Sequence, residues 1–136
     1  MDTSKQYIKM CDCPEIQEGW EHCKIIGDWY VVEEDFTSED DPAHGFYTKI
    51  YINIIGSYEE QSLASFKTIW LPRQDQLIGM LNWTNARGII IELEQYCLRN
   101  PDYMNQFNAN KSMEQLWLAF VMWELHGKQW DGEKWI

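Results

Sequence analysis

The sequence lacks an apolar run long enough to cross a lipid bilayer. Its clearest apolar stretch, Leu116–Trp123, has eight residues, whereas a membrane-spanning helix needs about 20. The opening residues Met1–Lys5 also lack the basic region and apolar segment of a secretory signal peptide. We therefore expect a protein of the reducing cytoplasm with no membrane partner, in which the four cysteines are thiols.

Basic residues are scarce in this chain. It has 11 Lys and Arg against 22 Asp and Glu, which gives a net charge of -11. Because affinity for duplex nucleic acid comes largely from Lys and Arg that neutralise phosphates, we expect no direct binding to duplex DNA. The charge is compatible with a basic protein partner or with mimicry of a polyanion, and equally with plain solubility.

Recognisable catalytic motifs are also missing. The sequence has no Gly-x-Ser-x-Gly, no glycine-rich phosphate loop and no His-Glu-x-x-His. The one metal-like group combines Cys11, Cys13, His22 and Cys23, but a single residue between paired cysteines is poor spacing for zinc. We therefore expect no metal, no cofactor and no catalytic residue, with a scattered hydrolase site as the alternative.

The C-terminal region carries the strongest helix signal. Ser112 and Gln115 form a predicted capping box, Leu116–Trp123 is apolar all round, and Gly127 suits a left-handed C-cap. A helix without a polar face must be surrounded by protein, so we expect it to be buried, with Trp123 at the centre of the domain. The Asp131-Gly132 pair predicts a tight turn that returns the tail to the core.

The periodicity of the remaining chain predicts an α+β fold in a single domain, residues 1–136. A small antiparallel sheet of about three strands is packed by helices and by the buried C-terminal helix. The predicted strands are Trp29–Val32, Phe46–Ile55 and Phe66–Trp70. The predicted helices are residues 3–12, Glu15–His22, Arg73–Leu81 and Ala86–Arg99, the last with Ile89, Ile90, Leu93, Tyr96 and Cys97 at helical spacing.

An acidic segment follows the first predicted strand. We expect residues 33–45 to form a loop, and six of its first nine positions are acidic. Such a loop is either a solvated excursion or a contact that speeds encounter with a basic partner. The candidate contact residues are Glu33, Glu34, Asp35, Glu39, Asp40 and Asp41.

A second candidate site lies at the corner between the third predicted strand and the next helix. Trp70 supplies an aromatic ring, Arg73 a cation, and Gln74 and Gln76 two amides. Free N–H groups at the start of a helix can bind an anion, which indicates a possible nucleotide site. The alternative is a structural corner in which Arg73 pairs with an acid and the helix N-terminus favours Asp75.

Four patches of the sequence lie in this order along the chain: Tyr7–Cys11, Trp70–Leu77, Ser112–Met122 and Trp130–Trp135. Together they resemble a family of small, uncharacterised bacteriophage and prophage proteins, chiefly from Firmicutes. The patches lie in the expected order, while the middle, Val31 to Phe66, matches poorly. The resemblance implies a phage gene that acts in a bacterial host cytoplasm, and it carries no activity or catalytic residues.

These observations favour a non-enzymatic phage protein that antagonises a host defence system. The expected partner is a host protein, such as a basic nuclease complex of the CRISPR type, contacted through the acidic loop and exposed tryptophans. One alternative is a sponge that sequesters a nucleotide signal at the Trp70 corner. Another is an accessory factor in phage replication or assembly, and a homo-oligomer is compatible with each.

Overall fold

The computed structural model describes residues 1–20, 28–35, 46–52, 67–101 and 112–136. These residues belong to two compact units. We call Met1–Met10 with Pro72–Ile136 the helical unit, and Cys11–Leu71 the sheet unit. The expectation of a single domain over residues 1–136 stays a prediction, and each unit is described by itself.

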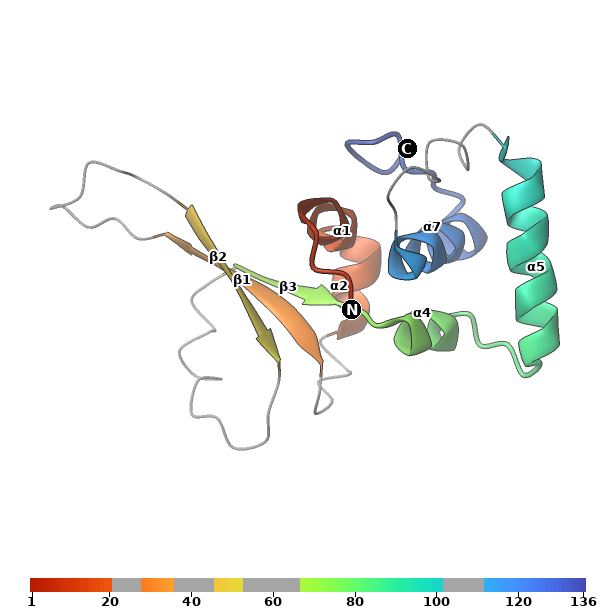
Figure 1. Ribbon diagram of the computed structural model, residues 1–136, viewed down its shortest axis with the longest axis horizontal. Helices are drawn as coiled ribbons and strands as arrows, with labels where there is room; N and C mark the ends of the chain where they lie inside the picture. The colour runs from red at the N-terminus through yellow and green to blue at the C-terminus, as the bar shows by residue number, and fades with distance from the viewer. Residues whose placement is uncertain (21–27, 36–45, 53–66, 102–111) are drawn as a thin grey trace, which may run out of the picture. The chain divides into compact units, whose positions relative to one another are not determined.

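The sheet unit is built on an antiparallel sheet. Strand β1 (Trp29–Asp35) lies between β2 (Phe46–Ile52) and β3 (Lys67–Leu71) and pairs antiparallel with both (Figure 1). Trp29 is opposite Ile52 on one side and Leu71 on the other. The predicted mixture of helix and antiparallel strand is therefore confirmed. The number of strands in the whole chain stays a prediction.

Strand β1 is longer than the sequence predicted. The prediction ended it at Val32 and placed the next residues in a loop, but β1 continues to Asp35. Its last three residues pair in register with Phe46, Tyr47 and Thr48 of β2. Acidic residues have a low strand propensity, but pairing with aromatic and β-branched neighbours overrides it, because strand propensity depends on context. The loop prediction was wrong for Glu33, Glu34 and Asp35.

Helix α2 (Pro14–Trp20) covers the outer edge of β3. The Gln17 side-chain amide accepts a hydrogen bond from Trp70 N–H at 2.9 Å and donates to the Trp70 carbonyl at 3.1 Å. It also donates to the Cys11 carbonyl at 2.8 Å. An exposed strand edge offers unpaired backbone groups to other chains, and Gln17 satisfies both backbone groups of Trp70 at this edge.

The core of the helical unit is α7 (Met113–His126), as the apolar run predicted. Trp117 to Met122 are all buried, and Gly127 ends the helix with φ +63°. Trp123 is different, because 37% of its surface is exposed. The prediction that Trp123 occupies the centre was wrong. Phe120, one turn earlier and fully buried, takes that place.

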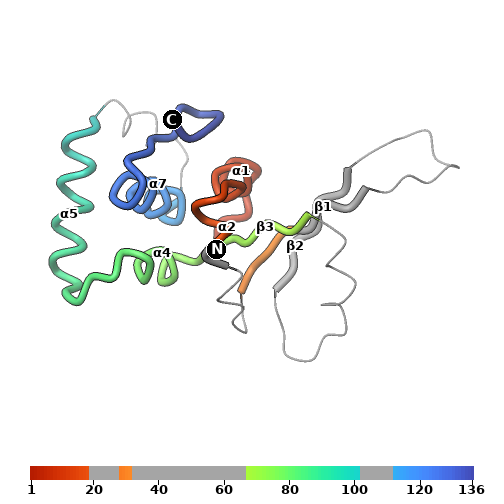
Figure 2. The backbone as a smooth tube through the Cα atoms, turned by 180° about the vertical axis from the view of Figure 1, so that it is seen from behind, coloured from red at the N-terminus to blue at the C-terminus, as the bar shows by residue number. Residues whose placement is uncertain are grey.

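Three further helices belong wholly or mainly to the helical unit. Helix α1 (Lys5–Cys11) contributes Tyr7, whose hydroxyl donates to the Pro72 carbonyl at 2.5 Å. Helix α4 (Gln74–Met80) packs against α7, and α5 (Ala86–Arg99) runs beside α7 in both views (Figures 1 and 2). Asn85 caps α5 by accepting from Arg87 N–H at 3.0 Å through its side chain.

The C-terminal turn forms as the sequence predicted. The Asp131 carboxylate accepts from the backbone N–H groups of Glu133 and Lys134, both at 2.8 Å, and Gly132 has φ +107°. These hydrogen bonds lower the Asp131 pKa below its usual value. The turn brings the rings of Trp130 and Trp135 together, with centroids 5.1 Å apart. Trp130 is buried, and the Trp135 indole N–H donates to the Met10 carbonyl at 2.8 Å.

Candidate functional site

Half of the predicted acidic contact lies on a regular strand. Glu33, Glu34 and Asp35 form the C-terminal end of β1, which is the middle strand of the described sheet. Glu39, Asp40 and Asp41 lie outside the described residues. The backbone of three consecutive acids is thus fixed by pairing with a neighbouring strand, where the sequence predicted a flexible loop.

The residues of the predicted nucleotide corner belong to different units. Trp70 is part of the sheet unit and is only 3% exposed. Arg73 belongs to the helical unit and is the N-cap residue of α4. Gln74 is the first residue of α4 and is partly exposed. Gln76, also partly exposed, accepts from Arg73 N–H at 2.8 Å through its side chain.

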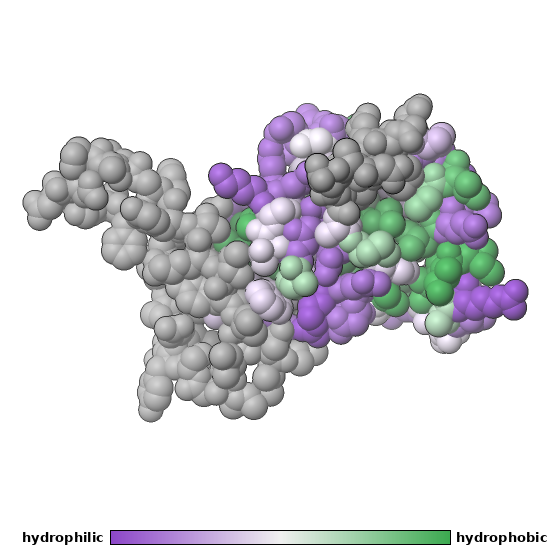
Figure 3. Space-filling model, in the orientation of Figure 1, coloured by the Kyte–Doolittle hydropathy of each residue, from purple (hydrophilic) through white to green (hydrophobic). Residues whose placement is uncertain are grey.

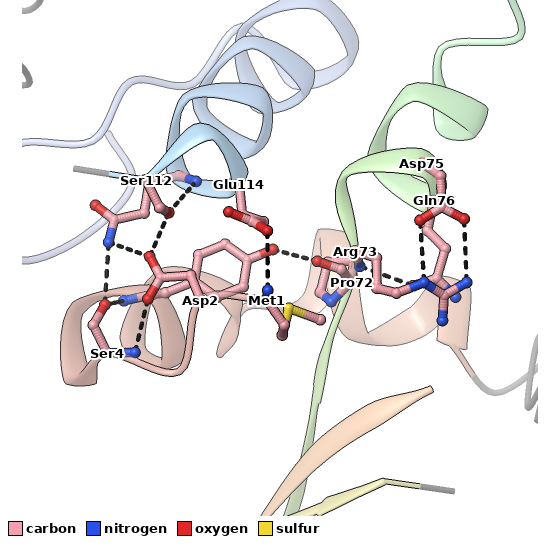
Figure 4. Close-up of polar contacts among 11 residues, drawn as sticks. Met1, Asp2, Ser4, Pro72, Arg73, Asp75, Gln76, Ser112 and Glu114 are labelled. Carbon is pink, nitrogen blue, oxygen red and sulfur yellow. Dashed lines mark hydrogen bonds and ion pairs between the residues drawn. The ribbon is translucent and has the colours of Figure 1, made fainter. Parts of the chain in front are cut away.

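The Arg73 guanidinium is already engaged by an acid. Its Nε and Nη2 atoms donate to the two carboxylate oxygens of Asp75, each at 3.1 Å (Figure 4). These hydrogen bonds, followed by the charge of Arg73, hold the Asp75 pKa below its ordinary value. Arg73 is thus paired with an acid, and that acid, Asp75, lies in the first turn of α4. Both features match the alternative of a structural corner.

The N-terminus of α7 holds an internal anion. The Asp2 carboxylate accepts from the Ser112 hydroxyl at 2.5 Å and from the Gln115 side-chain amide at 2.6 Å (Figure 4). It also accepts from Ser4 N–H at 2.8 Å. Burial raises the pKa of Asp2, but the hydrogen bonds outweigh burial, and the net shift is downward. This cluster attaches the start of the chain to α7.

Only half of the predicted capping box forms. The Ser112 hydroxyl accepts from Gln115 N–H at 3.2 Å, as expected. The Gln115 side chain does not return to Ser112 N–H. Instead its amide nitrogen donates to Asp2 and Ser4, and its oxygen has no hydrogen-bond partner in the described part of the chain. Ser112 therefore remains the N-cap acceptor, and Asp2 accepts from the side chains of both Ser112 and Gln115, a contact between distant parts of the chain that sequence spacing could not show.

A surface that the sequence did not predict lies on α5. Ile89 and Tyr96 are buried, and the Tyr96 ring packs against Phe120 with centroids 5.5 Å apart. Ile90, one of the residues noted at helical spacing, is 63% exposed, and Leu98 is 66% exposed. Figure 3 shows hydrophobic atoms over this helix. We call the exposed side the α5 outer face and define it as Trp83, Arg87, Ile90, Ile91, Glu94 and Leu98.

The described residues contain no group of three side chains that could hold a metal ion, and none of their helices is long and apolar enough to cross a membrane. Cys11, Cys13 and Cys97 are not joined in disulfides, and burial raises the pKa of the Cys97 thiol. His22 and Cys23, the other members of the metal-like group, lie outside the described residues. The expectation of no metal stays a prediction.

Comparison of the chain with protein-family models, with curated proteins and with solved structures found no match.

Proposed function

We propose that this chain is a non-enzymatic binding protein that antagonises a host defence system by contacting a basic, nucleic-acid-handling protein. The contact surface is the acidic segment that begins on β1 with Glu33, Glu34 and Asp35. The target class is a nuclease complex of the CRISPR type, and the setting is a bacterial cytoplasm. The resemblance to small phage proteins supports this setting.

The observation that carries the proposal is the position of the acids on β1. A net charge of -11 steers any basic partner towards the chain. Three of the acids lie on the backbone of a paired strand, so little ordering of that backbone is needed when a partner binds. Because ordering a loop costs binding free energy, a preformed strand gives a tighter complex than the predicted flexible loop would.

The nucleotide-sponge alternative has no specific observation in its favour. Stacking on a base needs an accessible ring, and Trp70 is buried. Binding a phosphate needs an available cation, and the Arg73 guanidinium is paired with Asp75. The sponge and the accessory role in phage replication or assembly are therefore outcomes that the test must separate from the proposal.

The test combines a cellular assay with a binding assay. Bacteria with an active DNA-targeting nuclease complex are challenged with a phage that the complex recognises, with and without this protein. We expect the protein to restore plaque formation. We also expect the purified nuclease complex to bind the immobilised protein, with an association rate that falls as salt is added, since ionic screening weakens electrostatic steering.

A matched pair of charge variants tests the contact surface. Glu33→Lys with Asp35→Lys changes two positions on the same face of strand β1, because alternate residues of a strand share a face. This pair should slow association by about tenfold or more and weaken the inhibition. Glu18→Lys with Glu124→Lys makes the same change in net charge at exposed positions on α2 and α7 and should have a much smaller effect. Equal losses in the two pairs, or no loss in either, would contradict the proposed surface. A thermal shift with nucleotides and no binding of the nuclease would favour the sponge.

A further inference from the structure

The outer face of α5 has the composition of an interface, although it faces solvent. Ile90 and Leu98 expose about two thirds of their surface, and Ile91 exposes 43%. The solvent side of a helix in a soluble protein is normally polar or charged. Neighbouring exposed aliphatic side chains on one helix face indicate a binding surface, whereas scattered ones do not.

The attachment of α5 to its own unit is sparse. Only Ile89 and Tyr96 are buried among its 14 residues. A helix of this length is marginal in water unless tertiary contacts stabilise it. A second layer of protein against the outer face would supply such contacts and would remove three aliphatic side chains from water.

The charges on the outer face are arranged for a second copy of the same helix. An antiparallel pair of α5 helices can be related by a twofold axis that passes between Ile90 and Ile91. Arg87 and Glu94 are equally distant from this axis in sequence, so Arg87 of each copy lies opposite Glu94 of the other. Within one helix these two residues are two turns apart, about 10 Å, which is too far for an ion pair. Neither forms an ion pair with another described residue.

The apolar residues fall into register about the same axis. Ile90 of one copy lies opposite Ile91 of the other, and Leu98 of each copy lies just beyond the first turn of the other α5. The Trp83 ring packs against Gly88, where a β-carbon would lie 3.4 Å from the ring, and it is 40% exposed. Trp83 therefore adds exposed aromatic surface at the start of α5.

From this register we infer that α5 is the seam of a homodimer, in which two copies pack their α5 outer faces antiparallel about a twofold axis between Ile90 and Ile91. The aliphatic residues and Trp83 supply the binding free energy, and the two Arg87–Glu94 pairs set direction and register. This inference concerns the helical unit alone and does not depend on the proposed target. A dimer would also carry two acidic segments, which raises the affinity for a partner with two basic sites.

The test is sedimentation velocity of the full chain across a range of concentrations. The salt should be about 0.15 M, because the Debye length is then about 8 Å and repulsion between two acidic chains is reduced. We expect a concentration-dependent dimer. A chain that stays monomeric at the highest soluble concentration would overturn the inference. The inference would also be overturned if the chain were a monomer and its α5 outer face bound a host protein instead of a second copy.

Apolar variants identify the surface. Leu98→Gln keeps a good helix former and should weaken the dimer by on the order of 100-fold, because a symmetric pair loses two buried leucines. Leu125→Gln removes an exposed leucine from α7 and should leave the dimer unchanged. Equal effects of the two variants, or none from Leu98→Gln, would overturn the seam.

Charge reversal tests the register. Arg87→Glu and Glu94→Arg should each weaken self-association by about tenfold, because two attractive pairs become repulsive. Combining both changes in one chain restores attraction and should restore the dimer. Mixing the two single variants should give a heterodimer tighter than either homodimer, a result that unfolding of a variant cannot mimic. Arg99→Glu is the control for Arg87→Glu, because it makes the same change in charge at a residue outside the α5 outer face, and it should leave self-association nearly unchanged. Failure of both rescues would overturn the antiparallel register.

Discussion

Helices α5 and α7 have the same length, 14 residues, and belong to the same unit, but their packing differs sharply. Seven residues of α7 are buried, against two of α5. On α7 the apolar run surrounds the helix, so every side requires cover. On α5 the apolar residues form two sides, of which one packs against α7 and the other faces solvent. Apolar spacing therefore predicts that a helix forms, but not which of its sides the chain itself covers.

The largest expected effect comes from making the same substitution on the two helices. Leu118→Ala should lower the free energy of unfolding by about 2–5 kcal/mol, because it opens a cavity at a fully buried position of α7. Leu98→Ala, measured at a dilution where the chain is monomeric, should change it by less than about 0.5 kcal/mol. Urea denaturation gives both values. Similar losses of unfolding free energy from the two substitutions would contradict the difference in packing between α5 and α7.

The N-caps provide a second and smaller comparison. Ser112→Ala removes the cap of α7 and also the hydrogen bond to Asp2, so we expect a loss of about 2 kcal/mol. Asn85→Ala removes a cap on α5 that has a single bond to Arg87 N–H, and we expect about 1 kcal/mol or less. Circular dichroism during urea unfolding measures both. A larger loss from Asn85→Ala would mean that α5 contributes more to the stability of the monomer than its burial indicates.

Much of the secondary structure could be predicted from the sequence, and the reasons are local. The cap at Ser112, the left-handed Gly127 and the Asp131-Gly132 turn each depend on neighbouring residues, and all three formed. The error at Glu33–Asp35 and the unpredicted exposure of Ile90 have a different origin. A partner strand decided the first, and the extent of cover over a helix decided the second. Local spacing contains neither piece of information.

The candidate sites were harder to predict for the same reason. Arg73 and Trp70 looked like ligand-binding groups because their residue types suit a nucleotide. Their partners, Asp75 for one and a buried environment for the other, became visible only in the structure. The α5 outer face was missed because Ile90 and Leu98 match the spacing of a core helix as well as that of an interface.

The smallest expected effect is a pH dependence at the start of α7. The folded pKa of Asp2 lies below its ordinary value because hydrogen bonds outweigh burial, so the carboxylate binds its proton less readily in the folded state. This stabilisation is present above the unfolded pKa of about 3.9 and is lost as the pH falls through the folded pKa. Urea midpoints between pH 2 and 6 should therefore fall more steeply for the natural chain than for Asp2→Asn. Parallel curves would contradict the role of Asp2 as a charged acceptor.

Hydrogen exchange, followed amide by amide at low and high protein concentration, is the most direct measurement of the contrast between α5 and α7. We predict that α7 amides exchange slowly at both concentrations, since they open only with global unfolding. In the dilute monomer, α5 amides should exchange faster than those of α7, and they should slow as the concentration rises and the outer faces pair. If α5 in the dilute monomer were as strongly protected as α7, with no dependence on concentration, the difference between the two helices and the seam would both be contradicted.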